Sequence, residues 1–318
     1  MSAYLGIEIG GTKLQLGVGS GSGPPLEELV RLDIDPGKKA AGILRSIEAA
    51  GRQLCQRHAV EAIGIGFGGP LDPTTGIVTC SHQVEGWENF PLQAWSEDKL
   101  SRPTALGNDC DLASLAEARF GAGKGSQRVF YVTVGTGVGG GLVIDGELQG
   151  RGRPAIAEIG HLRPSAEAIH PDQTVESLAS GPGIVSRVAE LLENSAAGDP
   201  DAGALIDICQ GKMEKLSAEQ IALAAEKGNR IALEAIADAV RILGWAIAQV
   251  VTLTAPDIVV VGGGVSLMDE DLFLAPLREK LEEFVFPPLR HSYQVVPPLL
   301  AEEVVVHGAL ALATDQVI

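Results

Sequence analysis

The feature that most constrains how this chain folds is a unit made of a strand, a glycine-rich turn and a second strand. The first unit is "YLGIEIGGTKLQLGV", in which residues 4–9 and 14–18 have the composition of strands and Gly10 and Gly11 form the turn. Glycine has no Cβ atom, so it adopts turn conformations that other residues avoid. The pattern recurs in "RVFYVTVGTGVGGGLVIDGELQ", which begins at residue 128. The recurrence predicts two related sheets, one in each of two domains.

A third glycine turn follows the apolar run "DIVVV", and each of the three turns comes directly after a predicted strand. A turn without Cβ atoms lets backbone N–H groups approach an anion closely, and threonine hydroxyls add donors. One such turn is equally typical of a hairpin that binds nothing, whereas three in one chain favour a nucleotide triphosphate site. The turns consist of Gly10, Gly11 and Thr12, then Gly135, Thr136 and Gly137, and finally Gly262, Gly263 and Gly264.

Two common phosphate-binding motifs are excluded. The sequence contains no GxxxxGK[ST], so this is not a P-loop protein. The segment "GTGVGG" matches GxGxxG, but it leads into a predicted strand rather than a helix, which argues against a dinucleotide-binding fingerprint. The predicted nucleotide site is therefore of another kind.

Composition limits the class of protein. With 318 residues, of which 45% are hydrophobic, the chain is long enough for two domains. Its net charge of −17 argues against nucleic-acid binding, which needs clustered Lys and Arg. The four cysteines lie far apart with no CxxC, so neither a disulfide framework nor a thiolate zinc site is indicated. These properties indicate an acidic cytoplasmic protein.

Neither a secretion signal nor a membrane anchor is indicated. The N-terminus has no basic region, and Glu8 interrupts its apolar run. The longest uncharged stretch, residues 242–256, is shorter than the ~20 residues of a spanning helix and contains Gln249. We interpret it as a buried helix and expect no membrane partner.

The remaining sequence alternates strands and helices. Residues 38–58 have helical spacing, and a strand at 60–67 leads into a Gly-Gly-Pro loop and a short return strand. The second half is mostly helical, with a helix in "ESLASGPGIVSRVAELLE", a long helix over residues 230–254 and a terminal helix in "EEVVVHGALALAT". No linker-like tract separates the halves, so we expect the two domains to share a tight cleft.

Asn108 and Asp109 are the candidates for catalysis in a kinase. Transfer of a phosphoryl group to a hydroxyl needs a carboxylate that accepts the hydroxyl proton. The pair lies where a predicted strand meets a helix that ends before Gly121, so the helix N-terminus would hold a carboxylate there. The alternative is an ordinary N-cap, and Asp111 shows that such acidic residues are common at helix starts.

The ordered set "IEIGGTK", "GNDCDLASLAE", "VGTGVGGGLVIDGEL", "AEIGHL", "VESLASGPGI" and "IVVVGGGVS" resembles the ROK family of sugar kinases and sugar-responsive repressors. The resemblance covers nearly the whole chain. It implies an α/β, two-domain actin-like ATPase (ribonuclease H-like) fold with an interdomain cleft. We place the smaller domain at residues 1–118 plus a C-terminal helix at 303–318, and the larger at 119–302. A homodimer is expected from the resemblance alone.

The resemblance also implies roles for individual residues. Asp109 matches the catalytic base. The first two glycine turns match the elements that hold the phosphates of ATP, with Glu8 and Lys13 on either side of the first turn. The third turn matches the one that lies by the adenosine. Mg²⁺ is bound mainly through ATP. Without the resemblance, the two glutamates predicted to line the sugar would be solvated surface charges and the histidine a structural one. The positions that match sugar contacts are Gly68, Gly69, Asn108, Asp109, Glu158, His161 and Glu176.

This sequence departs from the family in a zinc-binding segment. Many members continue after the Gly-His motif with CxCGxxGCxE, whose thiolates bind Zn²⁺ together with the histidine. The three cysteine positions are Glu167, Ile169 and Thr174 here. A Zn²⁺ site needs about four N or S ligands, which His161 and His170 cannot supply. We therefore expect no zinc.

Two further departures concern the sugar and the metal. The family often has an asparagine before the position of Trp87 that touches the sugar; this sequence has "CSHQVEGW", and we assign neither His82 nor Gln83 to that role. Where the family usually has aspartate before the first glycine turn, this chain has Glu8. Glutamate keeps the charge, and Mg²⁺ tolerates the extra methylene if the carboxylate acts through coordinated water. A family member without activity is the other explanation.

The predicted function is ATP-dependent phosphorylation of a hexose at its 6-hydroxyl, with Asp109 as general base. The hexose is glucose or a close relative such as mannose or an N-acetylated aminohexose. The alternatives are a sugar-sensing transcriptional regulator of the same family and a non-catalytic sugar-binding relative. Family repressors carry a helix-turn-helix before the sugar-binding fold, whereas four residues precede the first strand motif here, and the acidic charge disfavours DNA.

Overall fold

The computed structural model describes residues 2–81, 83–150 and 156–316. The chain forms two compact units. Unit 1 comprises Met1–Tyr131, Gly141–Ile156 and Pro298–Ile318, and unit 2 comprises Val132–Gly140 and Ala157–Pro297. These units are clusters of contacting residues, and the domain boundary expected at 118/119 stays a prediction.

Unit 1 contains a five-stranded sheet in the order β3-β2-β1-β4-β7. Strands β1, β2 and β3 pair in an antiparallel sense, whereas β1, β4 and β7 are parallel. The strands predicted at 4–9 and 14–18 are confirmed. The strands are β1 (Ala3–Ile9), β2 (Lys13–Gly19), β3 (Glu28–Asp33), β4 (Val60–Phe67) and β7 (Thr104–Asn108), and a separate pair is formed by β5 (Leu71–Asp72) and β6 (Ile77–Val78).

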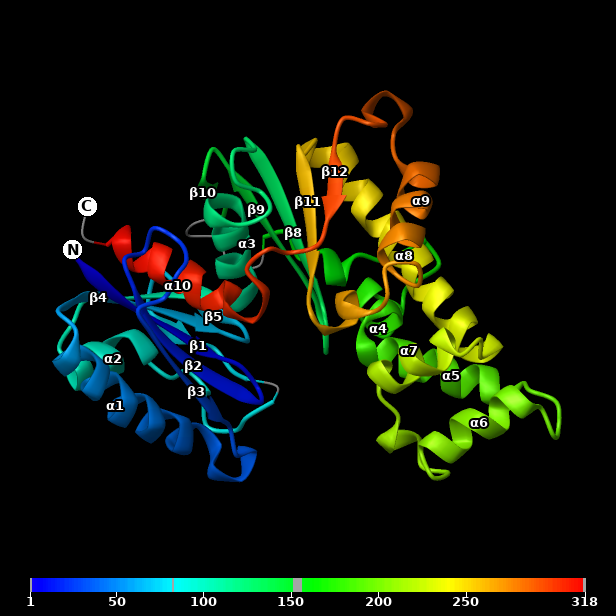
Figure 1. The fold of residues 1–318 in the computed structure, drawn as a ribbon, viewed down its shortest axis with the longest axis horizontal. Coiled ribbons are helices and arrows are strands. Elements are labelled where there is room, and N and C mark those ends of the chain that lie inside the picture. Colours follow the sequence, from blue (N-terminus) through cyan, green and yellow to red (C-terminus); the bar gives the residue numbers. More distant parts are fainter. Residues whose placement is uncertain (1, 82, 151–155, 317–318) are drawn as a thin grey trace. The chain divides into compact units, whose positions relative to one another are not determined.

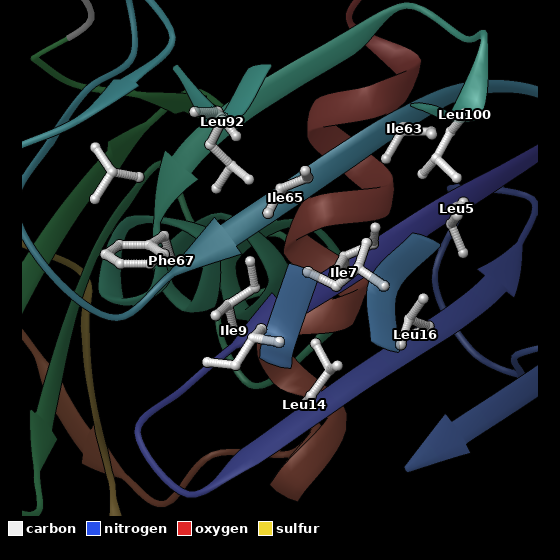
Figure 2. Packing of buried hydrophobic residues seen from close by; sticks show 14 of the residues in the cluster. Leu5, Ile7, Ile9, Leu14, Leu16, Ile63, Ile65, Phe67, Leu92 and Leu100 are labelled. Carbon is white, nitrogen blue, oxygen red and sulfur yellow. The ribbon is translucent and has the colours of Figure 1, made fainter. Parts of the chain in front are cut away.

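The two faces of this sheet carry different helices, because successive side chains of a strand point to opposite faces. Leu5, Ile7 and Ile9 of β1 belong to the core that includes the buried residues of α1. Tyr4 belongs instead to a second core with Val306 of α10. Figure 2 shows the first core, with the ribbon of α10 on the other side of the strands. The helices of unit 1 are α1 (Lys39–Arg57), α2 (Leu92–Leu100), α3 (Asp109–Phe120) and α10 (Val304–Thr314).

Helix α10 packs on β1, β4 and α3 (Figure 1). Glycines in the strands allow the close approach. A Cβ atom on Gly64 would lie 1.9 Å from the backbone O of Ala309, and one on Gly6 would lie 2.6 Å from the O of Val306. Even-numbered positions of β1 therefore face α10 and the segment before it, and Glu8 is one of them.

The second five-stranded sheet has the order β10-β9-β8-β11-β12. When the strands of each sheet are numbered along the chain, both sheets have the order third, second, first, fourth and fifth. The prediction of two related sheets is therefore confirmed. The boundary between the units cuts through β8 and β9, so each of these strands has residues in both units. The strands are β8 (Arg128–Val134), β9 (Val138–Ile144), β10 (Glu147–Leu148), β11 (Ile258–Gly262) and β12 (Gln294–Val296).

Most of unit 2 is helical, as predicted. Residues 242–254 of the uncharged stretch lie in the long helix α8, which ends at Thr254 and packs on α4, α5, α7 and α9. None of the helices in the described ranges is long and apolar enough to cross a bilayer. The helices are α4 (Val175–Ala179), α5 (Gly181–Glu193), α6 (Pro200–Ile208), α7 (Ala218–Glu226), α8 (Arg230–Thr254) and α9 (Leu274–Phe284), with 3₁₀ turns η1 (Pro36–Lys38), η2 (Ile159–His161), η3 (Met213–Lys215), η4 (Gly264–Leu267), η5 (Pro287–Leu289) and η6 (Ala301–Glu303).

The segment "ESLASGPGI" forms two helices rather than one. Ser180 ends α4 with an extended backbone and caps α5, because its hydroxyl accepts from the N–H of Gly183 at 3.3 Å. Pro182 then occupies the first turn of α5, where its missing N–H costs nothing. The break places the N-terminus of α5 beside the second glycine turn.

Candidate active site

The parallel strands of unit 1 end side by side. Ile9 of β1 pairs with Phe67 of β4, and Phe67 pairs with Asn108 of β7. Each of these residues is the last of its strand. The residues that follow therefore come together at the carboxyl edge of the sheet, which is where ligands bind in open α/β sheets. They are Gly10, Gly68 and Asp109.

Asn108 and Asp109 begin helix α3. The side chain of Asn108 caps the helix, with its Oδ1 accepting from the N–H of Cys110 at 2.9 Å and of Asp111 at 3.4 Å. Its amide nitrogen donates to the backbone O of Gly69 at 3.4 Å. The N-cap interpretation is thus correct for Asn108, which also reaches the glycine loop after β4.

Asp109 lies one residue further on, at the first position of α3. Its Oδ1 accepts from the N–H of Cys110 at 2.8 Å, which fixes the carboxylate at the helix N-terminus. Its Oδ2 lies 3.2 Å from the point that a Cβ atom would take on Gly68, and Gly10 Cα lies 3.7 Å from that point. The structure therefore places Asp109, Gly68 and Gly10 in one cluster.

The first glycine turn is closed by one bond between the N–H of Gly10 and the O of Lys13, 3.0 Å long. No described residue accepts from the N–H of Gly11 or Thr12. Two successive backbone amides without an internal partner fit an anion such as a phosphate. The side chain of Gln83 lies over Gly11, where a Cβ atom would overlap its Oε1. His82 lies outside the described residues.

Glu8 is buried, with 6% of its surface exposed. Its Oε2 accepts from Gln15 Nε2 at 2.7 Å, and its Oε1 lies 3.3 Å from Lys13 Nζ. Gln15 stands directly opposite on β2, so the bond crosses the strand pair. Burial raises the pKa of the Glu8 carboxyl above its ordinary value, and the Lys13 charge and the Gln15 bond only partly oppose this.

The pKa of Glu8 makes stability depend on pH. Because folding raises the pKa, the folded protein holds the Glu8 proton more tightly than the unfolded chain does. The resulting contribution to the free energy of unfolding is fully present below the unfolded pKa of about 4.3 and is lost as pH rises through the folded pKa. Replacing Glu8 with Gln should remove this contribution. We expect the free energy of unfolding of wild type, measured by urea titration, to fall relative to that of Glu8→Gln as pH rises from about 4.3. Parallel curves for the two proteins would contradict this assignment.

The second glycine turn lies in unit 2 and is held from two helices. Gly135 N–H donates to the O of Gly137 at 2.9 Å, and the O of Gly135 accepts from the N–H of Gly181 at 2.8 Å. The N–H of Val138 donates to Glu176 Oε2 on α4, also at 2.9 Å. The predicted sugar residue Glu176 is thus bonded to Val138, the residue that directly follows the predicted phosphate turn.

The third glycine turn lies against the same place. Gly263 has a φ of 91°, which favours glycine, and a Cβ atom there would lie 2.4 Å from the O of Val134. Val134 is the last residue of β8 and immediately precedes the second turn. The turns at 135–137 and 262–264, to which the family resemblance assigns different parts of ATP, are therefore neighbours.

Glu158 directly precedes the 3₁₀ turn η2, His161 is the last residue of the turn, and both are exposed. The middle residue of this turn, Gly160, packs directly on β9, because a Cβ atom there would lie 1.9 Å from the O of Val138. Val138 thus contacts η2 through its carbonyl and Glu176 through its N–H. The three predicted sugar residues of unit 2 gather around the start of β9.

The loop after His161 is held by Arg163. Its Nη1 donates to the O of Ala168 at 2.7 Å and to the O of His170 at 3.2 Å. The loop closes where the N–H of Val175 donates to the O of Leu162 at 2.9 Å. One guanidinium thus bonds two carbonyls from within the loop, and the sequence did not reveal this role.

The positions of the family's zinc ligands have other uses. Thr174 caps α4 by accepting from the N–H of Ser177, and 73% of the Ile169 surface is exposed. Within the described ranges, no group of three or more His, Cys, Asp or Glu side chains is placed to hold a metal ion.

We expect purified protein to contain far less than one zinc per chain by elemental analysis. Dialysis against EDTA should leave the melting temperature unchanged, because hydrogen bonds of Arg163 hold the loop. A stoichiometric zinc content would overturn this expectation.

A sequence model described as the ROK family matches residues 4–316. The chain belongs to the ROK family. A glucokinase from Thermotoga maritima is 30% identical over 98% of this chain and 98% of its own length.

Solved structures of the ROK family have the same fold. The crystal structure of a ROK family glucokinase from Streptomyces griseus, in complex with glucose and AMPPNP, covers 99% of this chain and 100% of its own, with a TM-score of 0.80 and 30% identity. A ROK hexokinase from Thermus thermophilus has a TM-score of 0.80 at 26% identity, covering 99% of each chain. The predicted two-domain actin-like ATPase fold is therefore confirmed.

Proposed function

We propose that this ROK protein is an ATP-dependent hexose kinase that phosphorylates glucose or a close relative at the 6-hydroxyl. The observation that carries the proposal is the register of β1, β4 and β7, which brings Gly10, Gly68 and Asp109 together. A carboxylate at a helix N-terminus, beside a turn with two free amides, combines a base with a phosphate cradle. Relatives named glucokinase support the same reaction.

Asp109 is the proposed general base. Its carboxylate accepts the proton of the sugar hydroxyl as the hydroxyl oxygen attacks the γ-phosphorus. The bond from Cys110 N–H holds the carboxylate in place. Asn108 donates to Gly69 and is proposed to orient the sugar together with Gly68 and Gly69.

The glycine turns are proposed to bind the phosphates and adenosine of ATP. Mg²⁺, when bound to the nucleotide, neutralises charge on the transferring phosphoryl group. Both oxygens of Glu8 already have partners in Gln15 and Lys13, so the proposed contribution of Glu8 is through coordinated water and through the position of Lys13.

Glu158, His161 and Glu176 are proposed to bind sugar hydroxyls, which are paired donors and acceptors. Glu176 uses Oε2 for the N–H of Val138, and its Oε1 has no partner among the described residues. The second oxygen therefore suits a hydroxyl donor. A homodimer remains our expectation from the family, and a cytoplasmic location remains our expectation from the composition.

The experiment is a coupled ADP-release assay with MgATP over glucose, mannose, fructose and N-acetylated aminohexoses. We expect turnover with at least one aldohexose, and product analysis by NMR should place the phosphate on O6. Absence of turnover with every sugar would remove the kinase proposal and leave a non-catalytic sugar-binding protein or a regulator. The regulator is not favoured, because a net charge of −17 disfavours DNA.

A further inference from the structure

Glu117 is a buried acidic residue that the proposed reaction does not use. It is 0% exposed and lies on α3, eight residues after the proposed base. Its Oε1 accepts from the N–H of Leu300 at 2.8 Å and of Leu299 at 3.0 Å, and its Oε2 accepts from the N–H of Ala122 at 2.7 Å. Burying a carboxylate is costly unless hydrogen bonds compensate it, and these charge-assisted bonds do so.

The amides that Glu117 binds belong to a particular segment of the chain. The chain leaves unit 2 at Pro297 and enters unit 1 at Pro298. Leu299 and Leu300 come immediately afterwards and lead through η6 into α10. Glu117 therefore attaches the point of entry to the helix that begins with Asp109.

The other end of this short segment is attached to the first glycine turn. Gln15 Nε2 donates to the O of Glu302 at 2.9 Å, and Lys13 Nζ donates to the same oxygen at 3.5 Å. The same two side chains bind the Glu8 carboxylate, which lies on β1 just before the turn. The segment at 299–302 thus connects Glu117 to both strands that flank the turn.

The backbone between the two attachments is in an unfavourable conformation. Ala301 has a φ of 47°, in the left-handed region that residues with a Cβ atom rarely adopt. Such conformations persist where the surroundings determine them, and they gather at functional sites. Here Glu117 holds the residue before Ala301, while Gln15 and Lys13 hold the residue after it.

We propose that Glu117 is a positioning residue for phosphoryl transfer. Its carboxylate, through Leu299–Glu302, fixes Lys13 and the first glycine turn relative to the helix that carries Asp109. The inference rests on the proposed function for its effect on catalysis, but the attachment itself can be tested without turnover. Neutralising the carboxylate should release the segment and loosen the glycine turn.

The test compares Glu117→Gln with a control that destabilises unit 1 elsewhere. Leu54→Ala removes a fully buried side chain of α1 from the core on the other face of the sheet. The measurements are kcat and KM at 25 °C, melting temperature, and hydrogen exchange of peptides covering residues 10–15 and 298–303. For Glu117→Gln we expect kcat to fall by roughly tenfold or more and the KM for MgATP to rise, with the hexose KM nearly unchanged.

The exchange data separate this inference from the proposed function. Faster exchange in both peptides of Glu117→Gln, but in neither peptide of Leu54→Ala, supports the attachment even if wild type phosphorylates no sugar tested. Faster exchange at 298–303 alone overturns the inference, as does an unchanged kcat in a protein that is active, or an equal loss of kcat in Leu54→Ala. If Glu117→Gln does not fold, Glu117→Asp keeps the charge on a shorter side chain. Both peptides of Glu117→Asp should then exchange faster than in wild type, and wild-type exchange in the peptide at 10–15 overturns the inference.

Discussion

Replacing Asp109 with Asn is expected to lower kcat by about 10²- to 10⁴-fold, the range that general bases contribute. Asparagine has nearly the same shape, and its amide oxygen can still accept from the N–H of Cys110, so α3 should begin as before. The amide cannot take up the proton that the sugar hydroxyl loses. The KM of the preferred hexose should change little, because the side chain still fills the same position beside Gly68.

The control for this change is Asp111→Asn, two residues further along the same helix. Asp111 also belongs to the first turn of α3, so the change in charge at the helix N-terminus is matched. We expect its kcat to stay near wild type in the ADP-release assay. If Asp109→Asn keeps more than about a tenth of the wild-type kcat, the role of general base is wrong.

Replacing Gly160 with Ala is expected to lower kcat/KM for the hexose by about 10²-fold, the effect of displacing binding groups by roughly 1 Å. The new Cβ atom would lie 1.9 Å from the O of Val138 and 3.0 Å from its carbonyl carbon. Both are backbone atoms, and the N–H of Val138 is bonded to Glu176, so β9 cannot yield easily. The turn η2 must move instead, and Glu158 and His161 move with it.

The loss should appear mainly in the KM of the sugar, because Glu158 and His161, which move with η2, are proposed sugar contacts. Unfolding of unit 2 should also become easier by ~1–3 kcal/mol, as is usual for overpacking. Gly203→Ala on α6 is the matched control, because a Cβ atom there meets nothing within 4 Å. Its kinetics should equal wild type, and stability should rise by up to about 1 kcal/mol. Equal kinetics for the two variants would falsify the packing argument.

Local sequence patterns were sufficient to predict most of the strands and helices of the fold. Strand pairs around glycine turns, the helix that starts at Asp109, and the helix over residues 230–254 follow from composition, spacing and end signals that act over a few residues. The break at Ser180 was missed, although Ser-Gly-Pro is itself a helix-start signal. Gln15 could have been found from strand alternation, since it is a polar residue opposite Glu8.

Other parts of the site could not be predicted in this way. Nothing in the spacing of "GHLRPSAEAIHP" indicates that Arg163 bonds carbonyls of its own loop, because that depends on the path of the loop. Glu117 was visible as the last residue of "GNDCDLASLAE", but two of its three partners, Leu299 and Leu300, lie 182 and 183 residues away. Its burial has no local signature.

The sequence by itself determined which groups are available: three glycine turns, the Asn108–Asp109 pair at a helix start, and an acidic residue before the first turn. The tertiary structure decided how they meet. The pairing of Ile9, Phe67 and Asn108 sets Asp109 beside Gly10 and Gly68, and the contacts of Val138 join Glu176 to the second turn. The reason is physical: backbone preferences and caps act within a few residues, whereas strand register and the partners of buried carboxylates are fixed by packing between segments far apart in the chain.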